Sequence, residues 1–313
     1  MTNFTLGTNL CFAINRFPEP QVWAQLVGEQ MGLHSVQLVS DLLHPFWPED
    51  ILQRQTAAIL EATRRYGVQV DSLMTGTFSR TNHLMFPQDD LRALWVGFFR
   101  RFIDLGVALG AQSVGSHFGI LSVYDVSHVD RYRARVDEAV RLWQELSFYA
   151  RERGLPYLYF EPMSVPREMG NTISQARELH ERLNAHAGVP IDMCLDVGHA
   201  PHPLERDPYQ WLEKLAPYAP IVHLQQTEAG YSRHLPFAPE YNAEGIVDAE
   251  RVLSILASRG RDKVWLGFEI LHRERWEQEA EVIPHHVASA RYWRALIPSD
   301  GPWCGQAASA SVQ

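Results

Sequence analysis

Cysteine is scarce in this chain, and its few cysteines show no pattern of a known site. Cys11, Cys194 and Cys304 are odd in number and lack metal-ligand spacing, which argues against a disulfide framework or a zinc finger and favours a reducing compartment. Long hydrophobic runs are also missing, since no stretch of about 18 uncharged apolar residues occurs. Because the first residues carry no basic, apolar leader, we expect a cytoplasmic protein with no membrane partner.

Basic charge is in the minority as well. The chain has 28 Lys and Arg against 37 Asp and Glu, a net charge of -9. Sequence-independent binding of nucleic acid depends on clustered basic side chains, so we expect no nucleic-acid partner. A glycine-rich phosphate loop is absent too, because residues 8–15 contain no G-x-G-x-x-G. This absence disfavours a doubly wound dinucleotide-binding sheet.

The chain instead shows a regular alternation of strand-like and helix-like segments. Helical stretches carry an apolar stripe on one side only, for example Leu94, Phe98, Phe102, Leu105 and Leu109, and such helices cover a parallel sheet. Glycines that follow several helices, as in Tyr66-Gly-Val, indicate left-handed caps before the next strand. Eight strands are expected, at residues 5–12, 35–39, 68–74, 113–117, 157–161, 191–196, 221–225 and 264–269.

Eight such units predict an α/β fold, a single (β/α)₈ TIM barrel. We assign the barrel to residues 1–297 as one catalytic domain, because no linker divides it. Residues 298–313 lack periodicity, and we expect them to form a flexible C-terminal tail.

Four polar residues close consecutive predicted strands, five to eight. They are Glu161, Asp196, His223 and Glu269. The carboxyl ends of barrel strands meet at one mouth, and three carboxylates that face one point repel each other unless a cation or protons neutralise them. One acidic residue after a strand often only caps the next helix, but four coincident endings favour a site for one divalent metal ion. The donors suit Mn²⁺ best, with Mg²⁺, Co²⁺ or Zn²⁺ as alternatives.

Two further histidines lie at the same predicted mouth. His117 ends the fourth strand, and His199 follows Asp196 by one tight turn. A lone histidine at a strand end is more often a hydrogen-bonded rim residue, but near a metal both become candidates for binding substrate.

Four segments around these residues carry a family resemblance. They are Phe160-Glu-Pro-Met, Cys194-Leu-Asp-Val-Gly-His, Val222-His-Leu-Gln-Gln and Gly267-Phe-Glu. In them the chain resembles the xylose isomerase-like superfamily of TIM barrels, which includes ketose 3-epimerases, sugar-phosphate isomerases and type IV apurinic endonucleases. The resemblance implies that the four strand-end residues Glu161, Asp196, His223 and Glu269, called the tetrad below, hold the metal. It also implies that Glu161 and Glu269 exchange a proton with substrate, and that Gln225 and His234 bind substrate.

The endonuclease branch fits poorly. Enzymes of this branch look built around three zinc ions, and both outer zinc sites would lack a ligand here. No histidine follows the third predicted strand, and Ser232 stands where an aspartate is expected beside His199 and His234. One metal and an acidic chain therefore indicate sugar chemistry. Within the superfamily, the sequence most resembles tetrulose-phosphate epimerases and isomerases and 3-oxo sugar acid decarboxylases.

Our main hypothesis is a metal-dependent isomerase or epimerase of a small ketose or ketose phosphate, acting through an enediolate. Two alternatives stay open, a metal-dependent decarboxylase of a 3-oxo sugar acid and a catalytic subunit of a C-glycoside cleaving system. Arg167 and Arg233, on loops after strands five and seven, are candidates for holding an anionic group of the substrate. The long aromatic loop 226–247 is of the kind that covers substrate or packs on a neighbouring subunit, and we expect a homo-oligomer.

Overall fold

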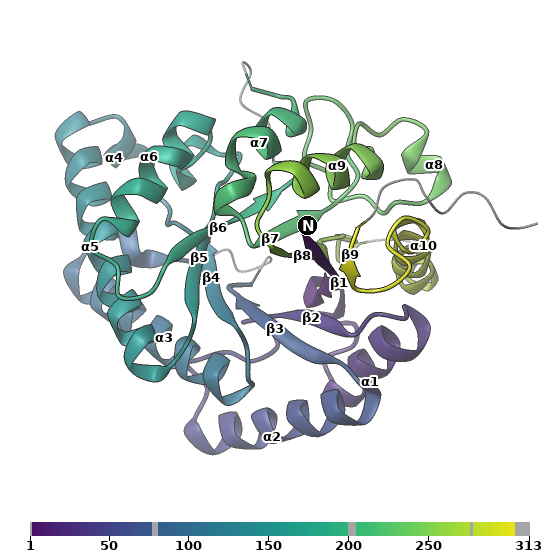
Figure 1. Cartoon of the computed structure of the whole chain (residues 1–313). Coiled ribbons are helices and arrows are strands. Elements are labelled where there is room, and N and C mark those ends of the chain that lie inside the picture. The colour runs from purple at the N-terminus through teal and green to yellow at the C-terminus, as the bar shows by residue number, and fades with distance from the viewer. Residues whose placement is uncertain (1, 77–80, 200–204, 276–277, 304–313) are drawn as a thin grey trace, which may run out of the picture.

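The protein is a closed parallel barrel surrounded by helices (Figure 1). The structure is a computed structural model and describes residues 2–76, 81–199, 205–275 and 278–303. Its strands are β1 (Asn3–Asn9), β2 (Ser35–Val39), β3 (Gln69–Met74), β4 (Ser113–His117), β5 (Tyr157–Glu161), β6 (Ile191–Asp196), β7 (Ile221–Leu224), β8 (Lys263–Phe268) and β9 (Gly301–Pro302). Strands β1 to β8 pair in sequence order and β8 pairs with β1, all in parallel. The predicted TIM barrel is confirmed.

The helices lie outside the barrel, and the longer ones bury one face against it (Figure 1). They are α1 (Pro20–Gln25), α2 (Glu49–Tyr66), α3 (Asp89–Ala108), α4 (Val123–Val126), α5 (Val129–Arg153), α6 (Ile173–Asn184), α7 (Pro208–Leu215), α8 (Pro239–Asn242), α9 (Ala249–Arg259) and α10 (Val282–Arg294). In α3 the buried stripe differs slightly from the expectation. Phe98 and Phe102 are buried as predicted, but Leu94 is 51% exposed and Trp95 takes the buried place beside Phe99.

Strand positions agree closely with the prediction except in the first strand. The expected run 5–12 is observed as Asn3–Asn9, followed by a 3-10 turn at Leu10–Ala13. Asn9 causes the early end, because its side-chain oxygen accepts a hydrogen bond from the Cys11 N–H at 2.8 Å and caps the turn. The predicted glycine caps are present, since Gly67 ends α2 at φ 63° and Gly154 ends α5 at φ 81°.

The beginning of the expected tail lies against the barrel. Gly301–Pro302 pairs antiparallel with Asn3 and Phe4, and Asp300 accepts hydrogen bonds from the Leu6 N–H at 3.2 Å and from Arg294 at 2.7 Å. Residues 304–313 lie outside the described residues. The flexible tail beyond residue 303 and the domain boundary at 297 therefore stay predictions.

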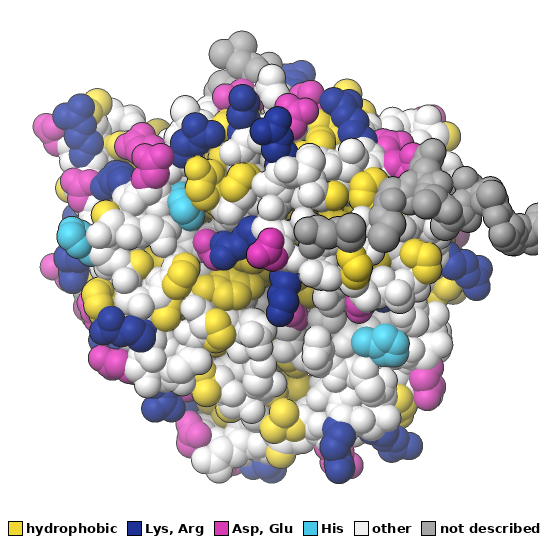
Figure 2. All heavy atoms as spheres, viewed as in Figure 1, with side chains coloured by type: hydrophobic (Ala, Val, Ile, Leu, Met, Phe, Trp, Pro, Cys, Tyr) yellow, Lys and Arg dark blue, Asp and Glu magenta, His cyan; other side chains and the backbone are white. Residues whose placement is uncertain are grey.

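The surface shows no concentration of positive charge on the face in view. Figure 2 shows Lys and Arg side chains mixed with Asp and Glu around this face. Among the helices of the described residues, none has the length and apolar character needed to cross a membrane.

Candidate active site

The carboxyl ends of four adjacent strands bring the predicted tetrad together. Glu161 ends β5, Asp196 ends β6, His223 lies in β7, and Glu269 directly follows β8. One ligand-type atom from each residue lies within 4.8 Å of the others. All four side chains are buried. The four residues therefore form one compact group of metal-ligand type, as the strand endings predicted.

His223 lies between the two glutamates. Its Nδ1 is 3.3 Å from Glu161 Oε1 and 3.1 Å from Glu269 Oε2. On the other side of the ring, Nε2 lies 2.8 Å from Gln37 Oε1. Because Asn9 Nδ2 also donates to this oxygen at 2.6 Å, the Gln37 amide is fixed as an acceptor. His223 must therefore donate through Nε2, and a neutral ring directs the lone pair of Nδ1 toward the carboxylates.

Asp196 is held by one oxygen and leaves the other for the site. Its Oδ1 accepts from the Gly198 N–H at 2.6 Å and from Gln225 Nε2 at 2.8 Å. Its buried Oδ2 accepts no hydrogen bond from any described residue. An ionised oxygen in that state costs free energy unless a cation neutralises it. Three carboxylates and one imidazole form a hard donor set, and this set fits a divalent metal ion.

The buried histidines and carboxyls of this site shift one another's pKa values. Burial raises the pKa of Glu161 and so does Glu269, but hydrogen bonds from His199 and His223 outweigh both and bring it to about 2. Burial lowers the pKa of His199, yet Asp196 and Glu161 raise it to about 9. The pKa of His223 is also raised well above its usual value against the effect of burial, by Cys194 and Glu269. The carboxylates therefore favour the protonated form of both imidazoles in this site.

The pKa values of the remaining two carboxyls shift in opposite directions. Burial raises the pKa of Asp196, although His199 and His234 oppose that shift. Burial also acts to raise the pKa of Glu269, but His223 holds it well below the usual range. Separated pKa values in one small site are typical of catalytic centres.

A cavity of about 280 Å³ opens above the tetrad. Its described lining consists of Met74, Thr75, Gly76, His117, Glu161, Met163, Ser164, His199, Ser232, His234, Glu269 and Leu271. Glu161 and Glu269 belong to this lining, whereas Asp196 and His223 do not. A larger hollow of about 670 Å³ lies between α2 and the start of β3, but it contains no tetrad residue. The predicted catalytic glutamates therefore lie at the smaller cavity.

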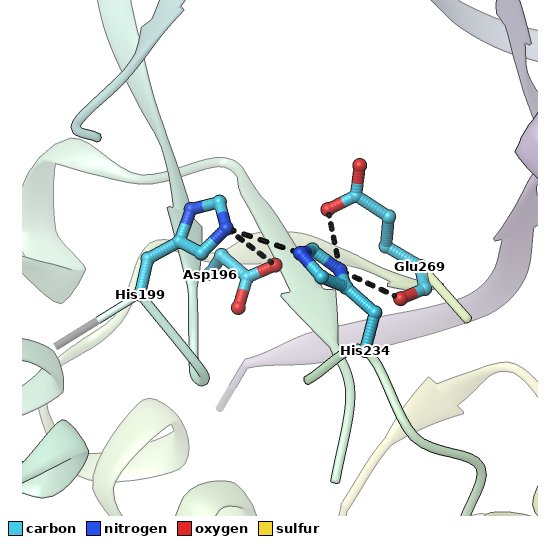
Figure 3. Close-up of side chains that lie close together, drawn as sticks. All are labelled: Asp196, His199, His234 and Glu269. Carbon is cyan, nitrogen blue, oxygen red and sulfur yellow. Dashed lines mark hydrogen bonds and ion pairs between the residues drawn. The ribbon is translucent and has the colours of Figure 1, made fainter. Parts of the chain in front are cut away.

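Three predicted histidines line this cavity. His117, His199 and His234 all line it. Figure 3 shows the rings of His199 and His234 side by side near Asp196 and Glu269, with an angle of 79° between their planes. His234 has a left-handed backbone with φ 54°, a conformation that is uncommon outside glycine and often occurs at functional sites. Its backbone N–H donates to Gln225 Oε1.

Three other predicted substrate residues lie outside the cavity lining. Gln225 is fully buried, and its amide holds Asp196 and the His234 backbone, so it positions other residues. Arg167 donates to the Leu121 carbonyl at 2.8 Å and ties two loops together. Arg233 pairs with Glu228 at 2.9 Å and lies over the Tyr231 ring. Direct contact of these three with substrate stays a prediction.

Sequence reasoning missed Gln37 and Asn9. Both are fully buried, and Gln37 Nε2 also donates to Ser72 Oγ at 3.2 Å and to Tyr159 OH at 2.9 Å. The available signal was an amide inside the apolar run Ser35-Val-Gln-Leu-Val, since a polar side chain on a buried strand needs a partner.

Comparison with known proteins decides the family. No family model matches the chain. D-erythrulose 1-phosphate 3-epimerase of Brucella abortus (strain 2308) is 33% identical over 298 residues, which cover 94% of this chain and 96% of that protein. The chain belongs to the xylose isomerase-like family of TIM-barrel sugar epimerases. It is accordingly an enzyme.

Solved structures agree with this assignment. The crystal structure of a Rhodospirillum rubrum protein named as a candidate xylose isomerase superposes with a TM-score of 0.85 at 29% identity, covering 93% of this chain and 99% of that one. D-psicose 3-epimerase of Clostridium cellulolyticum superposes with a TM-score of 0.71 at 13% identity, covering 93% and 98%. The second likeness shows the fold alone.

Proposed function

We propose that this enzyme is a metal-dependent 3-epimerase of a short ketose phosphate, of the tetrulose phosphate class. The main support is that only two of the four tetrad residues line the cavity. Glu161 and Glu269 line the cavity, while Asp196 and His223 lie behind it. The two carboxyls come from β5 and β8, which are separated by two strands in the barrel. Such carboxyls can reach a substrate carbon from different sides.

The tetrad would hold the ion, and the ion would stabilise the negative charge of an enediolate formed from the substrate. Asp196 and His223 are well suited to be pure ligands. Their orientation is fixed from behind by Gln225 and Gln37, and neither lines the cavity. The identity of the metal is part of the proposal, and Mn²⁺ fits the oxygen-rich donors best.

Glu161 and Glu269 would move the proton. One carboxylate removes the proton from C3, and the carboxyl on the other side delivers a proton to the opposite face of the same carbon. The proton that leaves and the proton that arrives therefore occupy different carboxyls. His117, His199 and His234 line the same cavity and would hydrogen-bond the substrate oxygens. An aldose–ketose isomerase would instead return the proton to a neighbouring carbon.

The volume of the cavity and the similarity to a named relative support the proposed substrate class. A cavity of about 280 Å³ lies at the small end for ligand sites and suits a four-carbon sugar with one phosphate. The Brucella relative is named for D-erythrulose 1-phosphate. A phosphate group also needs a partner at the mouth, and the roles of Arg167 and Arg233 in holding it stay predictions, as does a homo-oligomer.

A substrate panel tests this proposal. Mn²⁺-loaded enzyme is incubated with tetrulose phosphates, with the free tetruloses, and with pentuloses and hexuloses, and the C3 epimers are resolved by chromatography. We expect the highest kcat/KM with a tetrulose phosphate and no turnover in the metal-free enzyme. Preference for an unphosphorylated hexulose would refute the substrate class, and release of carbon dioxide from a 3-oxo sugar acid would refute the reaction.

A further inference from the structure

We propose that Asn9 is a positioning residue of the metal site, which fixes through Gln37 the ring nitrogen that His223 offers to an ion. A series of three hydrogen bonds links the backbone N–H of Cys11 to this histidine. Asn9 does not belong to the described lining of the cavity, so it acts on the site only through other residues. The inference rests on the proposed role of His223 as a metal ligand.

The turn that follows β1 fixes the direction of the Asn9 amide. A backbone N–H can only donate, and that of Cys11 lies 2.8 Å from Asn9 Oδ1. Oxygen must therefore occupy this side of the amide. The other atom is then Nδ2, which donates to Gln37 Oε1 at 2.6 Å. The 3-10 turn Leu10–Ala13 thus sets the orientation of the first amide in the series.

A second backbone group fixes the far side of the Gln37 amide. The Leu73 carbonyl can only accept, and the Tyr159 hydroxyl donates to it at 2.8 Å. Because its hydrogen is used there, the hydroxyl accepts from Gln37 Nε2 at 2.9 Å. Gly115 in β4 leaves room for this tyrosine, since a Cβ at that position would overlap with the ring. Both ends of the network are therefore fixed by backbone groups that cannot exchange the roles of donor and acceptor.

The direction of the Gln37 amide decides where His223 carries its hydrogen. With Oε1 toward the ring, Nε2 donates, and Nδ1 of a neutral ring is left for the ion. If the amide were turned over, its NH₂ group would face Nε2, and a neutral ring would carry its hydrogen on Nδ1. Nδ1 lies 3.3 Å from Glu161 Oε1 and 3.1 Å from Glu269 Oε2. It would then donate to these carboxylates and offer no lone pair to a metal.

Capping of a turn does not by itself account for Asn9. A cap uses only the side-chain oxygen, whereas Nδ2 reaches Gln37 on the neighbouring strand β2. Asn9, Gln37 and Tyr159 are all fully buried, at positions where apolar side chains would pack without the cost of burying polar groups. A buried polar network whose members are all paired specifies one arrangement. The arrangement specified here is the one that leaves Nδ1 of His223 free for the ion.

A double-mutant cycle on metal affinity tests this role. Asn9→Ser keeps an oxygen that can cap the turn but removes the Nδ2 donor. We expect Mn²⁺ binding to weaken about tenfold, the lower end of the range for direct partners of a ligating histidine. In the Gln37→Leu background, the same substitution should change the affinity by less than about twofold, because Asn9 acts through Gln37. Isothermal titration calorimetry measures all four proteins.

Asn82→Ser is the matched control for this cycle. Asn82 is also buried and caps a 3-10 turn, where its oxygen accepts from the Leu84 N–H at 3.1 Å. Its amide donates to the His117 carbonyl at 2.7 Å and not to the Gln37 side chain, so Mn²⁺ affinity should be unchanged.

Three results of the cycle would overturn the role of Asn9. The first is an Asn9→Ser affinity equal to that of wild type. The second is an undiminished loss in the Gln37→Leu background, which would show that Asn9 does not act through Gln37. The third is an equal loss in Asn82→Ser, which would show that removal of any buried capping amide weakens the site.

A second measurement needs neither bound metal nor a variant. Protein labelled with ¹⁵N at histidine gives NMR signals of ring N–H groups, and a buried, hydrogen-bonded ring N–H exchanges slowly with solvent. Wild-type protein should show this signal for Nε2 of His223, Gln37→Leu should lose it, and Asn9→Ser should shift it. Absence of the Nε2 hydrogen in wild type, or an identical signal in Asn9→Ser, would overturn the proposal. Failure of the wild type to bind Mn²⁺ would instead contradict the epimerase.

Discussion

Gln37 Oε1 lies 2.8 Å from Nε2 of His223, on the side of the imidazole away from the carboxylates. The oxygen also receives Asn9 Nδ2 at 2.6 Å, and the Gln37 amide nitrogen donates to Ser72 and Tyr159. The orientation of this amide is therefore determined on both ends. It assigns the hydrogen of a neutral His223 to Nε2 and leaves Nδ1 as the ligand atom.

The first prediction concerns this contact. Gln37→Leu should weaken Mn²⁺ binding by about 10- to 100-fold, because outer partners of a ligating histidine have effects of that size. Gln37→Glu keeps an acceptor for the Nε2 hydrogen and should retain most of the affinity. Isothermal titration calorimetry measures both, with the exposed Gln53→Leu as control. Equal affinities of Gln37→Leu and wild type would show that the contact does not orient His223.

The second prediction is a pH dependence of metal affinity. The pKa of His199 is raised to about 9 and that of His223 lies well above its usual value in the metal-free site, so an ion must displace protons. Mn²⁺ affinity should rise about tenfold per pH unit for each proton released, between about pH 6 and 9. Calorimetry in buffers of different ionisation enthalpy counts these protons. An affinity independent of pH over this range would contradict the protonated site.

The third prediction concerns His286, which is fully buried on α10 and packs 4.5 Å from the Phe12 ring. Burial lowers its pKa to about 3, and the charges of His272 and His285 add to the shift. Since the unfolded chain takes up this proton near pH 6.5, the stability is intact above that pH and falls as the pH drops toward 3. The His286→Leu variant has no such histidine, so it should not lose stability in this way as the pH falls. Relative to wild type, its unfolding free energy should improve by about 2 kcal/mol between pH 7.5 and pH 5.

Urea denaturation at the two pH values measures this difference, and the comparison of the two pH values cancels the packing change introduced by leucine. His128→Gln, at an exposed position, serves as the control. A His286→Leu effect of the same size at both pH values would show that His286 titrates normally in the folded protein.

The fourth prediction concerns the phosphate. Arg167 lies three residues beyond Ser164, which lines the cavity, and Arg233 lies next to Ser232 and His234, which line it as well. Substitution by Met of the arginine that holds the phosphate should raise KM for a tetrulose phosphate but not for the free tetrulose. The rise in KM should correspond to a loss of about 1.5 to 3 kcal/mol in binding free energy. Equal effects on both substrates in Arg167→Met and Arg233→Met would mean that other groups bind the anion.

The barrel and the tetrad were predictable because both depend on local sequence signals. Apolar strands, one-sided helices and glycine caps repeat along the chain, and the four polar strand endings need only the rule that parallel strands end at one mouth. The end of β1 was misplaced because Asn9 caps a turn inside an apolar run. In α3, Leu94 and Trp95 are adjacent and apolar, so only packing decides which of them is buried.

The supporting groups of the site were not predictable in the same way. Gln37 and Asn9 come from β2 and β1, and their contact with His223 in β7 exists only because the sheet closes into a barrel. Phe237, in the long loop expected to cover substrate, instead packs 5.3 Å from Trp293 in the core. The αL backbone of His234 leaves no mark in sequence.

The most direct test of the account is the fate of the C3 hydrogen. A tetrulose phosphate is incubated with Mn²⁺-loaded enzyme in deuterated water, and proton NMR follows C3 and the neighbouring carbons of substrate and product. Glu161 and Glu269 both line the cavity, so their carboxyls should exchange protons with solvent between turnovers. The C3 epimer should then carry one deuterium at C3 and none at C1 or C4. Product that keeps the original C3 hydrogen, or deuterium at C1, would contradict epimerisation by two carboxyls.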